Sequence, residues 1–331
     1  MKPTALRRYR RPASRSGATY RKAAGPVVVQ FGMRAIRQHA PGGTAGLRYE
    51  EIETPQPGPE EALVRVHAAA ITRDELEWTA DRLPATPSFE LSGVVAEVGA
   101  EVSDVVVGEP VYALLDFDRE GAAAEYALVQ AGLLAPKPST TTHVESAAIP
   151  LAALSAWQGL FDKGGLTECQ RVLIHGAAGG VGHLAVQLAR SRGARVIATV
   201  STANIAPVRR LGVDQVIDHT VERFEDLVEP VDLVFDTAGG ERLERSAAVV
   251  RPGGRLVSVA EEPVQTEGIA ALYFVVEPNR RQLIEIARLV DDGKLRPTID
   301  EVFPLAEARA AFERSLGDGR RGKIVVRVVE E

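Results

Sequence analysis

The chain has 331 residues, of which 45% are hydrophobic and 25% are charged, and its formal net charge is −6 at pH 7. This composition is typical of a folded globular protein and excludes a collagen-like fibre, a coiled coil and a wholly disordered chain. The negative net charge argues against a general nucleic-acid binder. No apolar run approaches the roughly 20 residues of a membrane span. The single cysteine excludes a disulfide framework and favours a reducing, cytoplasmic location.

The first 32 residues form a strongly basic arm. They contain eight lysines or arginines and no acidic residue, and the first acidic residue of the chain is Glu50. An arm with so little apolar surface to bury is expected to be disordered. Two interpretations stay open for it: an unfolded extension, from a start assigned upstream of Met33, or an organelle transit peptide.

Beyond the arm, the pattern of short strands changes at about residue 152. At roughly 100–200 residues per domain, the length predicts two domains. Residues 33 to about 150 contain alternating runs at 62–67, 93–98 and 125–129, punctuated by proline and glycine, which predicts a mostly antiparallel β domain. Later runs rich in β-branched residues alternate with helical patterns, which predicts βαβ units and a parallel sheet. These runs are 171–174, 194–198, 215–217, 231–235 and 255–259, and a helix at 281–290 and a strand at 323–328 follow them.

The most informative segment, residues 171–182, reads Arg-Val-Leu-Ile-His-Gly-Ala-Ala-Gly-Gly-Val-Gly. A strand leads into a glycine-rich turn, and a helix with one apolar face follows, so the segment matches the dinucleotide fingerprint with Ala177, Gly179 and Gly182 in its three key positions. A purely structural turn is the alternative. The fingerprint predicts that the helix N-terminus binds a pyrophosphate, held by Ala177, Ala178, Gly179, Gly180 and Val181.

The second parallel strand is expected to end beside the adenosine ribose. NAD-preferring sites usually place a carboxylate there, but no acidic residue occurs between Glu168 and Asp214. We therefore predict NADP(H) as the coenzyme. Arg209 or Arg210 would add positive charge or lie on a solvated face. The residues predicted to face the adenosine end are Thr199, Ser201, Thr202 and Asn204.

With these motifs in place, the chain from Met33 to its end resembles the medium-chain dehydrogenase/reductase superfamily, and most closely its zinc-independent quinone oxidoreductase branch. The matching stretches include 57–59, 92–99, 121–126, 151–158, 175–182, 236–240, 251–257 and 322–325. The resemblance implies an α/β protein with a doubly wound Rossmann domain over 152–276. It also implies a GroES-like, mostly antiparallel β domain formed by 33–151 and 277–331, a cofactor in the cleft between the domains, and commonly a homodimer.

The resemblance also implies which residues line the site. Thr72 takes the position of an asparagine near the nicotinamide and the substrate, and Tyr112 is a candidate donor to a substrate carbonyl or, alternatively, a half-buried tyrosine of the β domain. Ser155 takes the place of a threonine that opens the helix leading into the Rossmann domain. The remaining cofactor-binding candidates end the fourth and fifth parallel strands or form an apolar wall: Thr237, Ala238, Gly239, Val259, Ala260, Phe274, Val275 and Val276.

No metal is predicted. Zinc members of the superfamily carry Gly-His-Glu-x-x-Gly, whereas residues 88–93 read Ser-Phe-Glu-Leu-Ser-Gly, so Phe89 replaces the ligand and Glu90 is expected to be structural. Without a Lewis acid, the favoured substrates are quinones and α,β-unsaturated carbonyl compounds, because conjugation already polarises them. The proton that completes the product is expected to come from solvent. The alternative is a non-catalytic NADPH-binding sensor or structural protein.

Overall fold

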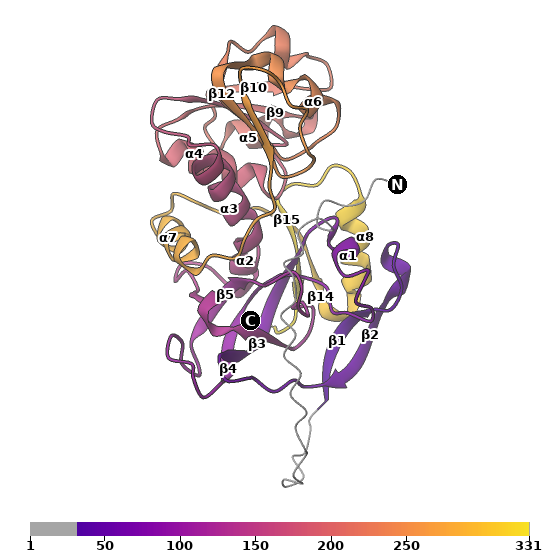
Figure 1. Cartoon of the computed structure of the whole chain (residues 1–331). Coiled ribbons are helices and arrows are strands. Elements are labelled where there is room, and N and C mark those ends of the chain that lie inside the picture. The colour runs from indigo at the N-terminus through magenta and orange to yellow at the C-terminus, as the bar shows by residue number, and fades with distance from the viewer. Residues whose placement is uncertain (1–31, 331) are drawn as a thin grey trace.

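Two sheets organise residues 32–330, the part of the chain that the computed structural model describes (Figure 1). The basic arm predicted over 1–32 lies outside the described residues except for Gly32, which begins the first strand. One sheet has six strands and the other has seven. Within residues 32–330, no helix is both long enough and apolar enough to cross a bilayer.

The six-stranded sheet is parallel throughout and has the order β10-β9-β8-β11-β12-β13. Its strand order reverses beside β8, which is the doubly wound arrangement that the βαβ pattern predicts. The sixth strand, β13, was not predicted from the sequence, because its residues Ala-Ala-Leu-Tyr include no β-branched side chain. The strands are β8 (Arg171–His175), β9 (Arg195–Val200), β10 (Gln215–Asp218), β11 (Val231–Asp236), β12 (Val250–Ser258) and β13 (Ala270–Tyr273).

Helices cover this sheet on both faces, so its strands are nearly continuous apolar runs rather than alternating ones. The helices before and between the strands are α3 (Pro150–Trp157), α4 (Gly182–Ser191), α5 (Ile205–Arg209) and α6 (Glu241–Arg245). A π-helical segment, η4 (Gln158–Lys163), continues α3 directly. Three short 3-10 turns complete this part of the chain: η5 (Thr202–Asn204), η6 (Phe224–Asp226) and η7 (Ser246–Val249).

The seven-stranded sheet has the order β14-β15-β3-β4-β5-β7, and β6 pairs with β3. All its pairs are antiparallel except β14 with β15. Because β15 pairs with β3, the first and last segments of the chain share one sheet. The strands are β3 (Glu61–Ile71), β4 (Glu90–Val98), β5 (Pro110–Leu114), β6 (Tyr126–Gln130), β7 (Ala135–Pro136), β14 (Ile299–Pro304) and β15 (Lys323–Arg327).

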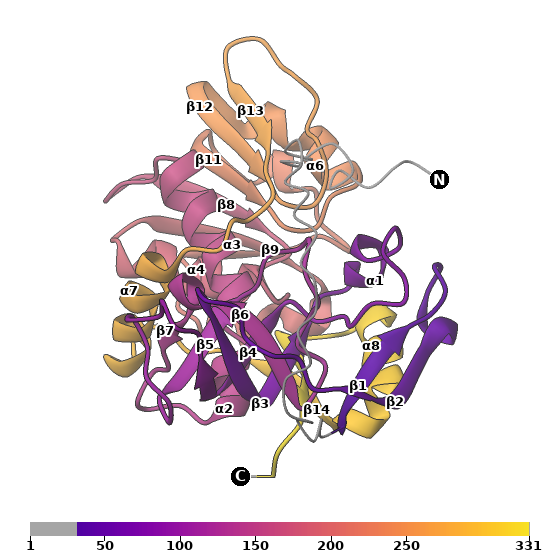
Figure 2. The same cartoon turned by 60° about the horizontal axis from the view of Figure 1, so that its bottom comes forward.

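A two-stranded ribbon, β1 (Gly32–Gln38) with β2 (Leu47–Glu53), stands beside this sheet and packs on α8 (Ala308–Leu316) through a small core that includes Ile36 and Phe312 (Figure 2). The remaining helices and turns are α1 (Glu75–Trp78), α2 (His143–Ala147), α7 (Arg280–Asp291), η2 (Thr44–Gly46), η3 (Ala131–Leu133) and η8 (Leu305–Glu307).

The two sheets meet where β15 begins, and Figure 1 shows this strand running down from the junction. The N–H of Gly322 donates to the carbonyl of Ala178 at 2.9 Å, and Gly179 forms an isolated parallel bridge with Gly322. One apolar core extends across the junction, since Val66 of β3 and Val172 of β8 belong to the same buried cluster. The glycine-rich turn is therefore held directly against the other sheet.

Candidate functional site

The glycine-rich turn lies between the carboxyl end of β8 and the first residue of α4. Gly176 has φ of +71°, and a Cβ there would lie 2.6 Å from Thr237 Oγ1, so this residue, rather than Ala177, makes the tight turn. A Cβ on Gly182 would overlap the carbonyl oxygen of Gly176, so only glycine lets α4 pack this closely on the strand. The unpaired N–H groups at the start of this helix fit a pyrophosphate.

Behind the turn, Thr199 does not present its side chain to a coenzyme. Its Oγ1 is 2.8 Å from His175 Nδ1, and His175 Nε2 is 3.0 Å from Ser246 Oγ, all in the buried interior. Burial lowers the pKa of His175 to about 3, so the ring is neutral and works as an internal hydrogen-bonding group. This corrects the prediction of a coenzyme contact from the Thr199 side chain.

At the adenosine end, the structure brings in a carboxylate that the sequence pattern had not indicated. Asp218 ends β10, the neighbour of β9, and accepts a hydrogen bond of 2.5 Å from Thr202 Oγ1. Hydrogen bonds from Thr202 and Thr220 hold the pKa of Asp218 below its usual range. The hydroxyl proton of Thr202 is thus already donated to Asp218. Ser201 Oγ instead accepts a hydrogen bond of 3.1 Å from the side-chain amide of Asn204, so its own hydroxyl proton is left to donate.

Asp236, which the sequence analysis did not select, orders the loops at the ends of β11 and β12. It is fully buried, and its carboxylate accepts from the backbone N–H of Gly239 at 3.0 Å, from that of Ala238 at 3.2 Å and from Ser258 Oγ at 2.8 Å. Burial raises its pKa, and these donors oppose that shift. Ser258 in turn accepts from Ala260 N–H, so one carboxylate fixes both loops that carry predicted coenzyme contacts.

The structure places the remaining predicted coenzyme residues unevenly. The residues that are exposed are Ala238 and Ala260. Those that are partly exposed are Ala178, Gly179, Gly180, Val181, Thr237, Val259 and Val275, and those that are buried are Ala177, Gly239, Phe274 and Val276.

Ser155 is the sixth residue of α3 rather than its first, and its hydroxyl donates to the Leu151 carbonyl at 2.7 Å. The prediction that Ser155 opens this helix is therefore wrong, because the helix begins at Pro150.

Tyr112 is a core residue. It is fully buried, and its hydroxyl donates to the carbonyl of Leu283 in α7 at 2.5 Å. Burial also raises the pKa of its phenol. The prediction that it donates to a substrate carbonyl is wrong, and the alternative of a structural tyrosine describes it better, although it is more deeply buried than that interpretation supposed.

Thr72 follows β3 and joins a buried charged cluster. Lys323, the first residue of β15, places its Nζ 3.1 Å from Thr72 Oγ1 and 2.5 Å from Glu90 Oε1. The side chains of Lys323 and Glu90 are only 5% and 1% exposed, so water barely screens this ion pair. The second oxygen of Glu90 accepts from the N–H of Leu151 at 2.8 Å and so caps the first turn of α3.

Glu75 completes this cluster. It is fully buried, and its Oε2 accepts from the backbone N–H of Thr72 at 3.1 Å, while Oε1 has no hydrogen-bond partner among residues 32–330. Burial raises the pKa of Glu75 to about 8; Lys323 opposes this shift and Glu90 adds to it. At neutral pH the carboxyl group of Glu75 is therefore mostly protonated.

Replacing Glu75 with glutamine is expected to reduce the dependence of stability on pH. Between pH 4.5 and about 8 the unfolded Glu75 has lost its proton and the folded one has kept it, so the free energy of unfolding falls as pH rises, by at most about 1.4 kcal/mol per pH unit. Glutamine removes this slope while its amide oxygen still accepts from Thr72. Urea unfolding at several pH values measures the difference. The exposed Glu77→Gln is the control, and equal slopes for Glu75→Gln and the parent protein would contradict the assignment.

An aromatic cluster lies next to the charged one. Phe89 precedes Glu90 and is fully buried, with ring centroids 5.8 Å from Trp78 and 5.5 Å from Phe117. Trp78 and Phe117 are half-buried and meet edge to face at 5.1 Å. Among residues 32–330, no group of three or more His, Cys, Asp or Glu side chains is arranged to hold a metal ion. The arrangement leaves the rings of Trp78 and Phe117 partly exposed.

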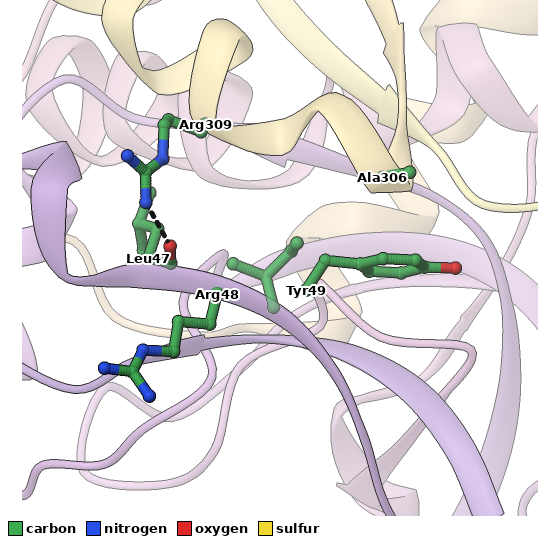
Figure 3. A pocket seen from close by; sticks show the side chains of 6 residues that line it. Leu47, Arg48, Tyr49, Ala306 and Arg309 are labelled. Carbon is green, nitrogen blue, oxygen red and sulfur yellow. Dashed lines mark hydrogen bonds between the residues drawn. The ribbon is translucent and has the colours of Figure 1, made fainter.

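A separate hollow of about 310 Å³ lies between β2 and η8, lined in part by Leu47, Tyr49 and Ala306 (Figure 3). Arg309 at its edge donates to the Leu47 carbonyl at 2.6 Å and so is already occupied. Its lining includes neither the glycine-rich turn nor Thr72, so it does not belong to the site built above.

Two family models match the chain. The model described as alcohol dehydrogenase GroES-like domain matches residues 58–139, and the model described as zinc-binding dehydrogenase matches residues 211–326.

Curated proteins and solved structures match over most of the chain. It is 34% identical over 292 residues to the 2-methylene-furan-3-one reductase of Solanum lycopersicum, covering 83% of this chain and 74% of that protein. It is 33% identical over 303 residues to the NADPH-dependent alkenal/one oxidoreductase, chloroplastic, of Arabidopsis thaliana, covering 86% and 77%. The structure of the quinone oxidoreductase from Coxiella burnetii matches with a TM-score of 0.83 at 30% identity, covering 90% of this chain and 100% of that one. These likenesses confirm the predicted α/β fold class, with a Rossmann sheet and a GroES-like β domain.

Proposed function

Because this chain belongs to the quinone oxidoreductase-like branch of the medium-chain dehydrogenase/reductase superfamily, and is therefore an oxidoreductase that uses a nicotinamide coenzyme, we propose that it reduces a quinone or an α,β-unsaturated carbonyl compound with NADPH. The bound coenzyme supplies a hydride. For an enone, the hydride adds to the β carbon, the electron pair of the double bond moves toward the oxygen, and a proton from solvent completes the α carbon. For a quinone, one hydride and one proton give the hydroquinone.

One observation carries this proposal: the glycine-rich turn is joined to Thr72 by a short, continuous set of contacts. The turn bonds to Gly322, Lys323 follows in the chain, and the ammonium of Lys323 reaches Thr72 at 3.1 Å. A dinucleotide whose pyrophosphate lies on this turn would extend its nicotinamide along the carboxyl ends of the parallel strands. The reacting end would then lie between those strand ends and the Thr72 loop.

Two features favour a conjugated acceptor over a simple ketone. Phe89 stands where zinc members of the superfamily place a histidine ligand, so the residues present do not fit a catalytic metal. A carbonyl conjugated to a double bond needs less electrophilic help. The half-buried rings of Trp78 and Phe117 also suit a flat, apolar substrate. The names of the Solanum lycopersicum and Arabidopsis thaliana relatives point to substrates of the same class.

NADPH is the proposed coenzyme because the adenosine end presents donors more than free acceptors. Asp218 is the nearest carboxylate there, and three hydrogen bonds from Thr202 and Thr220 already satisfy it. Ser201 retains a hydroxyl proton for a 2′-phosphate. The Arabidopsis relative is named as NADPH-dependent.

The proposal is tested by following NADPH consumption with a panel of quinones and enones. We expect turnover with these acceptors and little or none with the matched saturated ketones, which carry the same carbonyl without conjugation. NADH in place of NADPH is expected to give weaker binding. Tight NADPH binding without turnover on any acceptor would instead support a non-catalytic sensor or structural protein.

A further inference from the structure

We propose that Lys323 is a positioning residue for this reduction: its ammonium holds the Thr72 hydroxyl so that the hydroxyl proton donates to the substrate oxygen as negative charge develops there. The inference rests on the proposed function and names how the protein stabilises the charge that hydride transfer produces. Thr72 donates a hydrogen bond and not a proton, and the proton that completes the product still comes from solvent.

The direction of the Thr72 hydroxyl follows from its partners. Lys323 has only protons to give, so at 3.1 Å Thr72 Oγ1 must be the acceptor, and its own proton is directed away from the ammonium. Lys323 and Glu90 lie on the buried side of Thr72, whereas Thr72 itself is partly exposed. The proton is thus turned toward the exposed side. A hydroxyl that accepts from a cation is also a stronger donor, because hydrogen bonds in a chain polarise one another.

The backbone of the Thr72 loop is fixed as well. Glu75 accepts from the N–H of Thr72, and the α1 helix starts at Glu75, so the hydroxyl projects from a loop tied down at both main chain and side chain. Such fixed donors cost no reorganisation when charge appears.

The site of the coenzyme lies on the other side of Lys323. A Cβ on Gly180 of the glycine-rich turn would come within 2.9 Å of Lys323 Cδ, so the aliphatic part of this lysine packs against the turn while its ammonium reaches Thr72. Gly322 has φ of +71°, and a side chain there would overlap the carbonyl of Thr298, so glycine is needed to bring Lys323 to this place. The lysine therefore sets the spacing between pyrophosphate and hydroxyl.

Stability alone does not account for the cluster. A buried ion pair is often no more stabilising than apolar side chains of the same volume, because both charges must leave water. The Lys323–Glu90 pair is nonetheless placed so that one proton of the ammonium is left for Thr72.

The test is a double-mutant cycle between Thr72 and the ion pair. Thr72→Val removes the hydroxyl at constant shape, and Lys323→Met combined with Glu90→Gln removes the pair without leaving a buried charge. Each change is expected to lower kcat about 10- to 100-fold with NADPH affinity within about 3-fold of the parent. If Lys323 acts through Thr72, the triple variant is no slower than the slower of the two. Thr72→Ser is expected to restore most of the rate.

The proposal would be overturned if the fold-losses in kcat of the two separate changes multiplied in the triple variant. It would also be overturned if NADPH affinity fell as much as kcat. Thermal unfolding of each variant separates loss of folding from loss of rate.

A second measurement does not depend on turnover. With NADP⁺ present, 4-nitrophenol serves as a probe whose absorbance shows whether it is bound as phenol or phenolate. The parent protein is expected to favour the phenolate, and Thr72→Val and the Lys323→Met/Glu90→Gln pair are expected to lose that preference to the same extent. An equal preference in all variants, or no binding, contradicts the role of Thr72 and Lys323. Absence of NADPH turnover with a normal nitrophenol result would count against the proposed substrates only.

Discussion

Replacing Gly182 with valine is expected to raise the dissociation constant of NADPH at least about 100-fold, or ~2.7 kcal/mol. A side chain at this position overlaps the carbonyl oxygen of Gly176 and approaches the Cα of Ala177, which are backbone atoms that have no rotamer to change. Either α4 moves off the strand or the turn deforms, and both displace the N–H groups that we propose bind the pyrophosphate. We expect a loss of about 1–3 kcal/mol in stability as well. Fluorescence titration with NADPH measures the first effect and urea unfolding the second.

Gly132→Val is the matched control, because a Cβ on Gly132 meets nothing within 4 Å and its backbone is not in the left-handed region. It is expected to bind NADPH as the parent does. Normal NADPH affinity in folded Gly182→Val would show that the glycine-rich turn does not bind the coenzyme, and the assignment of this site would then be wrong.

Ser201→Asp is expected to reverse the coenzyme preference. The new carboxylate at the end of β9 would repel a 2′-phosphate and accept from a ribose 2′-hydroxyl. Like charges in contact cost several kcal/mol, so NADPH affinity is expected to fall about 100-fold or more, while NADH affinity stays equal or improves. The ratio of kcat/KM for the two coenzymes is the measurement.

Thr266→Asp adds the same charge at an exposed position between β12 and β13 and is expected to leave the ratio unchanged. If Ser201→Asp also leaves it unchanged, the adenosine ribose does not lie beside Ser201, and the basis for proposing NADPH is lost.

The sequence predicted the parallel sheet and the glycine-rich turn well, because both depend on local pattern. A strand, a glycine-rich turn and a helix lie within residues 171–191, and hydrophobic periodicity is sufficient to find the strand and the helix. Even here, the pattern placed Ala177 in the first key position of the fingerprint, whereas the positive φ belongs to Gly176.

Contacts between distant segments were beyond this approach. Asp218 contacts Thr202 because β10 lies next to β9 in the sheet. A search for acidic residues confined to the few positions that directly follow β9 does not include Asp218. The Thr199 side chain was misassigned for a related reason, since successive residues of a strand face opposite sides and its hydroxyl meets His175 in the interior. Tyr112 was misassigned because its partner, Leu283, is 171 residues away.

Lys323 left a signal that was not used. A charged residue directly after Gly322 opens a strand whose next three residues are apolar, and a lysine there must find a buried partner or stay in water. The stretch 322–325 matched the family pattern, but its lysine was not assigned a role. Of the two buried acidic residues beside it, Glu90 was expected only to be structural, and Glu75 was not assigned a role.

The pairing of β15 with β3 has a consequence for how the molecule assembles. Ile324 pairs with Ile71, so about three-quarters of the chain separates two neighbours in one sheet, and contacts of such long range form slowly. During synthesis, the segment from β8 to β13 emerges contiguously and is able to fold first. The position between β3 and β14 is then filled late, by residues 323–327. Catalytic competence is thus expected to appear only after the C-terminal strand has left the ribosome, well after a nucleotide-binding unit has formed.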